Sequence, residues 1–116
     1  MHLFVYGTLK RGLSRAPALS RQRFLDEART QPFYRMYDCG TYPGLVESAD
    51  GLPISGEVWD VDAACLAQLD RIECVAENLY RRGRIALQPP FDRQDVEAYF
   101  YQQDISGLRD CGDRWT

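Results

Sequence analysis

Helical periodicity is confined to one clear stretch of this chain, and its scarcity restricts the folds available. Asp62 is a typical helix N-cap. Leu66, Leu69 and Ile72 follow at three-residue spacing and give one apolar stripe over two to three turns. We expect this helix to end near residues 73–74. Helix therefore does not alternate with strand along the sequence, which excludes a doubly wound parallel sheet.

Strand patterns occur on both sides of that helix. They are found at Leu3–Tyr6, Phe33–Asp38, Leu45–Val46, Ile54–Val61, Tyr80–Leu87 and Val96–Gln102. Turns are marked by Tyr42-Pro43-Gly44, Asp50-Gly51 and Pro89-Pro90. Pro17 favours a short helix near residues 16–22, whereas residues 23–36 are mixed in character before the strand at Phe33. The sequence predicts an α+β fold of five or six strands, a small mixed barrel-like sheet with one main helix.

The length of 116 residues predicts one domain spanning residues 1–116. A net charge of −3, without a block of like charges, argues against nucleic acid or an anionic membrane as a main partner. The apolar run at residues 3–6 is too short for a signal peptide or a membrane span. We therefore expect a cytoplasmic protein. The sequence gives no indication of its oligomeric state.

Cysteine and histidine usage predicts neither a metal site nor a cofactor. The four cysteines form no Cys-x-x-Cys pair, and no histidine stands at metal-ligand spacing. We expect the cysteines to be reduced and to act as small hydrophobic residues. Cys74 as a nucleophile would need His2, the only histidine, as its base, so this alternative is disfavoured.

The loop after the first strand is a candidate binding element. It reads Tyr-Gly-Thr-Leu-Lys-Arg-Gly over residues 6–12. A strand that ends in a glycine-containing loop commonly presents backbone N–H groups to an anionic ligand. Gly7 lets the backbone approach closely because it has no Cβ. On the alternative interpretation Gly7 is only a turn residue, and Lys10 and Arg11 form a solvated loop edge.

Glu73 is the carboxylate that we single out at the end of the predicted helix. It lies about 100° around the helix from Ile72, so it flanks the apolar stripe. Partial desolvation there raises the pKa of a carboxyl group, as a general base requires. The alternative is a solvated residue at a helix end. Asp70 and Glu77 are local rivals for the same role.

Several motifs occur in a characteristic order along the whole chain. They are Phe4–Gly12, Tyr42–Val46, Gly56–Asp62, Leu69–Glu73, Tyr80–Arg82, Phe100-Tyr101 and Cys111–Trp115. Together they resemble the γ-glutamylcyclotransferase-like (AIG2-like) family. Two departures stand out: many members carry an Asn-His pair where this chain has Ser14–Pro17, and the tail disrupts the family's Ser-Gly-Asp-Trp ending.

The resemblance implies an activity and roles for individual residues. Glu73 takes the place of the family's catalytic acid/base, and Tyr6, Gly7, Thr8 and Leu9 take the place of its substrate-binding loop. Tyr42, Tyr80 and Tyr101 are further substrate-binding candidates, with packing as the alternative for all three. The implied reaction is intramolecular aminolysis of a small γ-glutamyl compound, which yields 5-oxoproline and a released amine or amino acid, with no cofactor.

Family members that lack the glutamate define a second hypothesis. Such a protein would bind a small acidic metabolite or a protein partner through the same cavity without catalysis. The presence of Glu73 beside an intact loop at residues 6–9 favours the enzyme.

Overall fold

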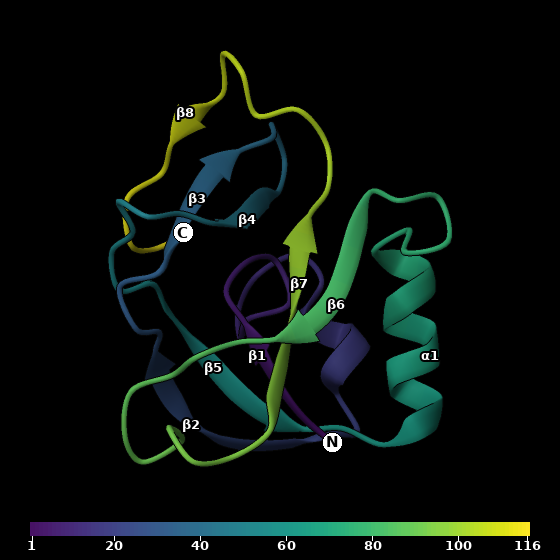
Figure 1. The fold of residues 1–116 in the computed structure, drawn as a ribbon. Coiled ribbons are helices and arrows are strands. Elements are labelled where there is room, and N and C mark those ends of the chain that lie inside the picture. The colour runs from purple at the N-terminus through teal and green to yellow at the C-terminus, as the bar shows by residue number, and fades with distance from the viewer.

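Eight strands, one α-helix and one 3-10 helix form the fold in the computed structural model, which describes residues 1–116 (Figure 1). The larger sheet has the order β2 (Arg23–Arg29), β5 (Ser55–Asp60), β1 (His2–Val5), β7 (Val96–Tyr101), β6 (Tyr80–Arg84). The smaller sheet has the order β4 (Pro43–Glu47), β3 (Tyr34–Asp38), β8 (Arg109–Asp110). The predicted α+β class is confirmed. The barrel-like description needs correction, because β2 and β6 remain at the edges of an open sheet.

Strand β1 occupies the centre of the larger sheet. It pairs antiparallel with β5 and parallel with β7. Its side chains alternate between two cores: Leu3 and Val5 face one, and Phe4 faces the other together with Tyr6, which follows the strand. The chain therefore leaves β1 at Gly7 from the middle of the molecule, which places the following loop beside both cores.

The two cores lie on opposite faces of the larger sheet. One core packs that sheet against β3 and β4, with Met36 and Leu45 fully buried. The other packs it against α1 (Ala63–Ile72) and the 3-10 helix η1 (Ala16–Leu19), through Leu69 and Leu19. Each such side chain contributes roughly 1.5–3 kcal/mol on burial. The end of α1 is therefore held firmly against the sheet.

Helix α1 forms as the sequence predicts. The Asp62 side chain accepts a hydrogen bond from the Cys65 backbone N–H at 2.7 Å, and the cap at the other end is Glu73. The helix is ten residues long. None of the helices has the length and apolar character that a membrane crossing requires.

Several elements differ from the sequence-based expectations. β2 is an additional strand, and its side chains are mostly exposed, so it carries no apolar alternation. The helix near residues 16–22 is only the short η1. β6 ends at Arg84, before the predicted limit of Leu87, which makes an isolated bridge with Thr30 instead.

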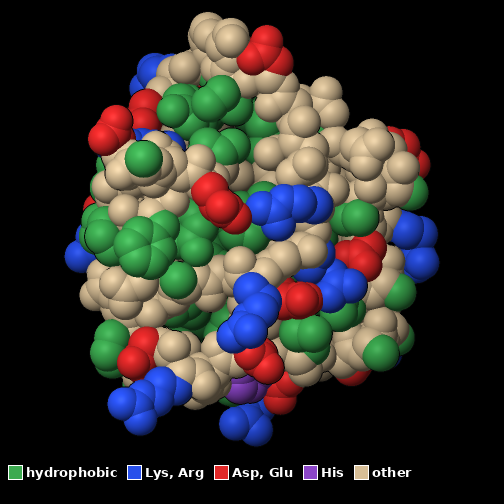
Figure 2. All heavy atoms as spheres, viewed as in Figure 1, with side chains coloured by type: hydrophobic (Ala, Val, Ile, Leu, Met, Phe, Trp, Pro, Cys, Tyr) green, Lys and Arg blue, Asp and Glu red, His purple; other side chains and the backbone are tan.

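The arginines of edge strand β6 are each paired with acidic side chains. Figure 2 shows basic and acidic side chains lying side by side on the face of the molecule that carries β6. The ion pairs are Arg81–Glu47, Arg82–Asp70, Arg82–Glu97 and Arg84–Asp95. Charged side chains on an edge strand oppose pairing with another chain.

Candidate functional site

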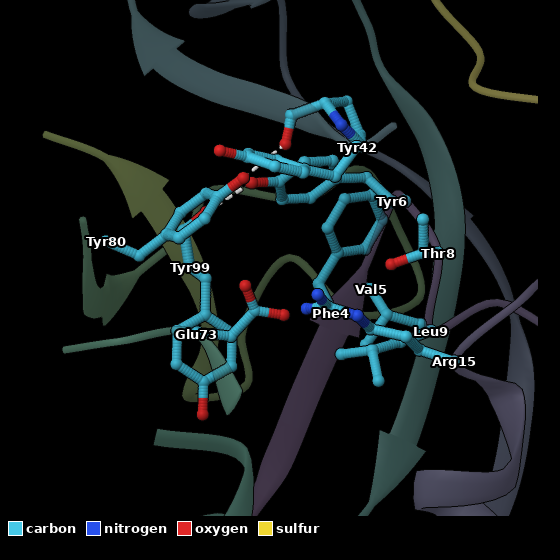
Figure 3. A pocket seen from close by; sticks show the side chains of 12 residues that line it. Phe4, Val5, Tyr6, Thr8, Leu9, Arg15, Tyr42, Glu73, Tyr80 and Tyr99 are labelled. Carbon is cyan, nitrogen blue, oxygen red and sulfur yellow. Dashed lines mark hydrogen bonds between the residues drawn. The ribbon is translucent and has the colours of Figure 1, made fainter. Parts of the chain in front are cut away.

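A cavity opens where the end of α1 meets the loop after β1 (Figure 3). Its lining residues come from β1 and the following loop, the start of η1, the start of β4, the end of α1, β6 and β7. They are Phe4, Val5, Tyr6, Gly7, Thr8, Leu9, Arg15, Tyr42, Pro43, Glu73, Tyr80 and Tyr99. All the site residues predicted from the sequence are among them except Tyr101. The Tyr101 ring packs edge-on against Tyr80, which does line the cavity, at 5.5 Å between ring centres.

Glu73 is buried at the C-cap of α1, with 9% of its surface exposed. Its backbone N–H donates to the Leu69 carbonyl, and its carboxylate points into the cavity (Figure 3). Burial raises the pKa of Glu73 from 4.5 to about 6, and the charge of Arg15 partly opposes this rise. No protein group donates a hydrogen bond to the carboxylate. Glu73 is therefore a partly desolvated carboxylate that is free to exchange a proton near neutral pH.

The rival carboxylates are placed differently. Asp70 accepts hydrogen bonds from Arg82 at 3.0 and 3.2 Å and from the Tyr99 hydroxyl at 2.7 Å. Partial burial favours a higher pKa for Asp70, but these hydrogen bonds outweigh it and hold the pKa below its ordinary value. Glu77 is exposed in the loop after the helix and does not line the cavity. Glu73 is thus the acidic side chain of this cavity.

Tyrosine hydroxyls fix the walls of the cavity to the backbone. The Tyr6 hydroxyl donates to the Tyr99 carbonyl at 2.6 Å and accepts from the Leu45 N–H at 3.3 Å. The Tyr80 hydroxyl donates to the Pro43 carbonyl. Burial raises the pKa of both Tyr6 and Tyr80 above the ordinary value, so both remain protonated. These hydroxyls join β1, β4, β6 and β7, and none of them orients Glu73.

The loop after β1 leaves three consecutive amides without a partner. The backbone N–H groups of Gly7, Thr8 and Leu9 donate no hydrogen bond within the protein. The loop is closed by other bonds, in which Lys10 N–H donates to the Gly7 carbonyl and Arg15 N–H donates to the Thr8 carbonyl. Successive free N–H groups beside a cavity are a favourable place for an anionic ligand atom.

Glycine is required at position 7 by close packing. A Cβ built there would lie 2.7 Å from Cγ of Pro43, so no larger side chain fits without a shift. This contact holds the loop against β4. The absence of a Cβ at Gly7 therefore serves packing within the protein.

Glu57 anchors the far side of the same loop. It is buried, and it accepts hydrogen bonds from the Arg11 backbone N–H at 3.1 Å, the Arg11 Nε at 3.0 Å and the Trp59 Nε1 at 3.1 Å. The Arg11 guanidinium also stacks over the Phe24 ring at 3.7 Å. The interpretation of Arg11 as a solvated loop edge is thus incomplete, because it ties the loop to β5 and β2.

Sequence reasoning did not select Arg15 or Tyr99. Arg15 drew notice only as part of a departure from a family motif, and its approach to the cavity depends on how η1 docks. Tyr99 stands two residues before Tyr101 on the same face of β7, so strand alternation offered a signal for it. Of these two tyrosines only Tyr99 lines the cavity, and Tyr101 lies beside Tyr80 in the pairing of β7 with β6.

The cysteines are all free, and no group of three or more His, Cys, Asp and Glu side chains could hold a metal ion. Cys74 follows Glu73 in the chain but does not line the cavity. Its Sγ faces the Ile72 carbonyl at 3.8 Å. The geometry therefore brings Glu73, not Cys74, to the cavity.

Comparison with known proteins identifies the family of the chain. A family model described as "Gamma-glutamyl cyclotransferase, AIG2-like" matches residues 3–116. The chain belongs to this family. A relative from Vibrio cholerae, which carries a provisional gamma-glutamylcyclotransferase name, is 40% identical over 111 residues, covering 96% of this chain and 92% of the relative.

Solved structures of family relatives show the same fold. The solution structure of the protein ytfP from Escherichia coli is 31% identical, covers 99% of this chain and 95% of that one, and has a TM-score of 0.72. An AIG2-like protein from Mus musculus is 28% identical, covers 85% of this chain and 75% of that one, and has a TM-score of 0.74. The expected γ-glutamylcyclotransferase-like fold is thus confirmed.

Proposed function

We propose that this protein converts a small γ-glutamyl compound into 5-oxoproline and a free amine or amino acid by intramolecular aminolysis. The observation that carries the proposal is the buried, unpartnered carboxylate of Glu73 in a cavity that is also lined by residues 7–9, whose amides have no hydrogen-bond partner in the protein. Family membership supports the same class of activity.

Glu73 supplies the proton transfer that the reaction needs. The substrate's α-ammonium group is not nucleophilic until it loses a proton to the carboxylate. The freed nitrogen then attacks the γ-carbonyl carbon and forms the ring C–N bond, and collapse of the adduct breaks the bond to the leaving nitrogen. The leaving nitrogen takes up the two protons that the ring nitrogen loses, one of them through Glu73. A pKa of about 6 suits a group that both accepts and returns a proton.

The unpartnered amides of Gly7, Thr8 and Leu9 supply the complementary electrostatics. They can hold either the substrate's α-carboxylate or the oxyanion that develops on the γ-carbonyl. Since nucleophile and electrophile belong to one molecule, a bound pose close to ring closure contributes up to about 7–11 kcal/mol to the lowering of the barrier. The tyrosine-lined walls keep that pose out of bulk water.

The proposal is tested by incubating the pure protein with a panel of γ-glutamyl amines and γ-glutamyl amino acids and measuring 5-oxoproline. We expect release from at least one compound, and we expect Glu73→Gln to lower kcat/KM by about 10²-fold or more. Glu77→Gln is the matched control, because it removes an exposed carboxylate four residues away and should leave the rate unchanged.

Two results would contradict the proposal. Equal activity in the Glu73→Gln variant would remove that carboxylate from the mechanism. Tight binding of panel compounds without any 5-oxoproline would instead favour the non-catalytic hypothesis, in which the same cavity only binds a small acidic metabolite.

A further inference from the structure

Arg15 brings a positive charge to the cavity opposite the catalytic candidate. It is the only cationic side chain among the lining residues, and it extends toward Glu73 (Figure 3). No salt bridge joins the two, and the Arg15 side chain has no hydrogen-bond partner in the protein. The guanidinium therefore has its donors available to a ligand in the cavity.

We infer that Arg15 binds a carboxylate on the leaving half of the substrate, so that the substrate class is a γ-glutamyl amino acid with a free carboxylate and not a γ-glutamylamine. This inference rests on the proposed cyclisation. It adds which half of the substrate Arg15 recognises and what chemistry that half must carry.

The charges of the site match those of such a molecule. A γ-glutamyl amino acid carries one ammonium and two carboxylates. The cavity offers the Glu73 carboxylate for the ammonium, the free amides of residues 7–9 for one carboxylate, and the Arg15 guanidinium for the other. A guanidinium binds a carboxylate through two parallel hydrogen bonds, which gives both strength and orientation. A γ-glutamylamine with a neutral leaving group would leave Arg15 without a partner.

Burial indicates which carboxylate Arg15 meets. Gly7 and Leu9 are buried, whereas Arg15 is exposed to solvent on its outer side. The glutamyl half must place its ammonium at buried Glu73, so its own α-carboxylate, which shares the same carbon atom, lies in the deep part of the cavity. The leaving half must depart toward solvent. The exposed guanidinium is therefore suited to the half that leaves.

The same pairing assists the proton transfer. Arg15 lowers the pKa of Glu73 against the larger effect of burial. A carboxylate bound to Arg15 offsets its positive charge, which weakens this effect and makes Glu73 a stronger base once the correct substrate is in place. A substrate without that carboxylate gains neither the contact nor the added basicity.

The test uses two substrates that differ by one charge, γ-glutamyl-alanine and γ-glutamyl-alaninamide. We expect the wild-type protein to show a kcat/KM for the acid at least about tenfold above that for the amide, the value of one charge-assisted hydrogen-bonded pair. Arg15→Gln should remove this preference by lowering the rate with the acid while leaving the amide within about twofold. Arg93→Gln is the control, because it removes an exposed arginine that does not line the cavity.

A binding measurement separates this inference from the proposed reaction. In the Glu73→Gln background, calorimetry should show tighter binding of the acid than of the amide, and adding Arg15→Gln should abolish the difference. If that discrimination holds but the wild type releases no 5-oxoproline, the cyclisation fails, whereas the assignment of Arg15 to the second carboxylate of a bound γ-glutamyl amino acid stands. Three outcomes would overturn the assignment: the acid and the amide bind equally well, neither binds, or Arg15→Gln weakens the binding of both by the same factor. A thermal unfolding curve of Arg15→Gln that matches the wild type excludes a folding defect.

Discussion

Glu57 and Glu73 are buried to nearly the same degree, at 7% and 9% exposure, but their surroundings are opposite. Glu57 accepts three hydrogen bonds, two from Arg11 and one from Trp59. Glu73 accepts none and faces the cavity. Both lie beside the loop that follows β1, one anchoring it from behind and the other facing it across open space.

The difference distinguishes a carboxylate whose charge is compensated within the fold from one that has the properties expected of a proton-transfer group. Burial of a charge is unfavourable unless hydrogen bonds and opposite charge compensate it. At Glu57 that compensation is complete, and the result is a fixed loop. Glu73 accepts no hydrogen bond from the protein, so burial raises its pKa and its proton can exchange with a ligand in the cavity. A perturbed carboxyl group in a cleft is a typical mark of a functional site.

The largest expected effect of the difference between Glu57 and Glu73 is on the pH dependence of the proposed reaction. In the proposed mechanism Glu73 must be ionised to accept a proton, and its pKa is raised to about 6, so kcat/KM should fall below about pH 6 by about tenfold per pH unit. The measurement is the rate of 5-oxoproline release across the acidic range. The residual activity of Glu73→Gln should lack this inflection, and a wild-type midpoint near 4 would contradict the desolvated state of Glu73.

Removing the carboxylate of Glu57, whose charge is compensated by hydrogen bonds, should lower the free energy of unfolding. Glu57→Ala leaves the buried Trp59 Nε1 without its acceptor and releases Arg11, so we expect a loss of about 1–3 kcal/mol in the free energy of unfolding. Urea denaturation measures it. Glu27→Ala is the control, because Glu27 also meets Arg11 but is exposed, and its loss should stay within about 0.5 kcal/mol. Equal effects of the two substitutions would refute the anchoring role of Glu57.

Removing the carboxylate of Glu73, which has no hydrogen-bond donor in the protein, should raise the free energy of unfolding at neutral pH. The folded state holds the Glu73 proton more tightly than the unfolded chain, so the destabilising contribution of Glu73 is absent below its unfolded pKa and complete above about 6. Glu73→Gln should therefore gain up to roughly 2 kcal/mol at about pH 8 and nothing at about pH 4. Thermal or urea unfolding at both pH values tests this, and a gain of equal size at both would point to packing instead.

The smallest effect concerns Asp70, the compensated neighbour of Glu73 on the same helix. Tyr99→Phe removes the hydroxyl that donates to Asp70 but leaves both hydrogen bonds from Arg82. We expect a loss of about 1 kcal/mol in unfolding free energy, measured by urea denaturation. A loss as large as that of Glu57→Ala would show that Asp70 depends on Tyr99 more than on Arg82.

Elements with strong local patterns were predictable from the sequence. Helix α1 has a capping Asp62 and an apolar stripe, and β5 has clear alternation, so each lies within a residue or two of its predicted limits. β2 was missed because its mostly exposed side chains carry no such pattern, and its pairing with β5 decides its structure. β8 has only two residues, Arg109 and Asp110, too few for any pattern.

The site was predictable only where local geometry determines it. The place of Glu73 next to the apolar stripe follows from helical geometry, and the loop at residues 6–9 follows from its glycine. The sequence predicted a raised pKa for Glu73 and free amides in the loop, each against a stated alternative, and the packing around these groups decides between the alternatives. Arg15 and Tyr99 reach the cavity through the docking of η1 and the register of β7, which local pattern does not encode.

The central position of β1 has a consequence for how the proposed activity is lost on unfolding. Its partners β5 and β7 lie more than fifty residues away along the chain, and the cavity takes its walls from both ends of the sequence. No fragment can assemble the cavity before those distant segments meet. Loss of the proposed activity in heat or denaturant should therefore coincide with the unfolding of the whole sheet, with no partly unfolded species that keeps an intact cavity.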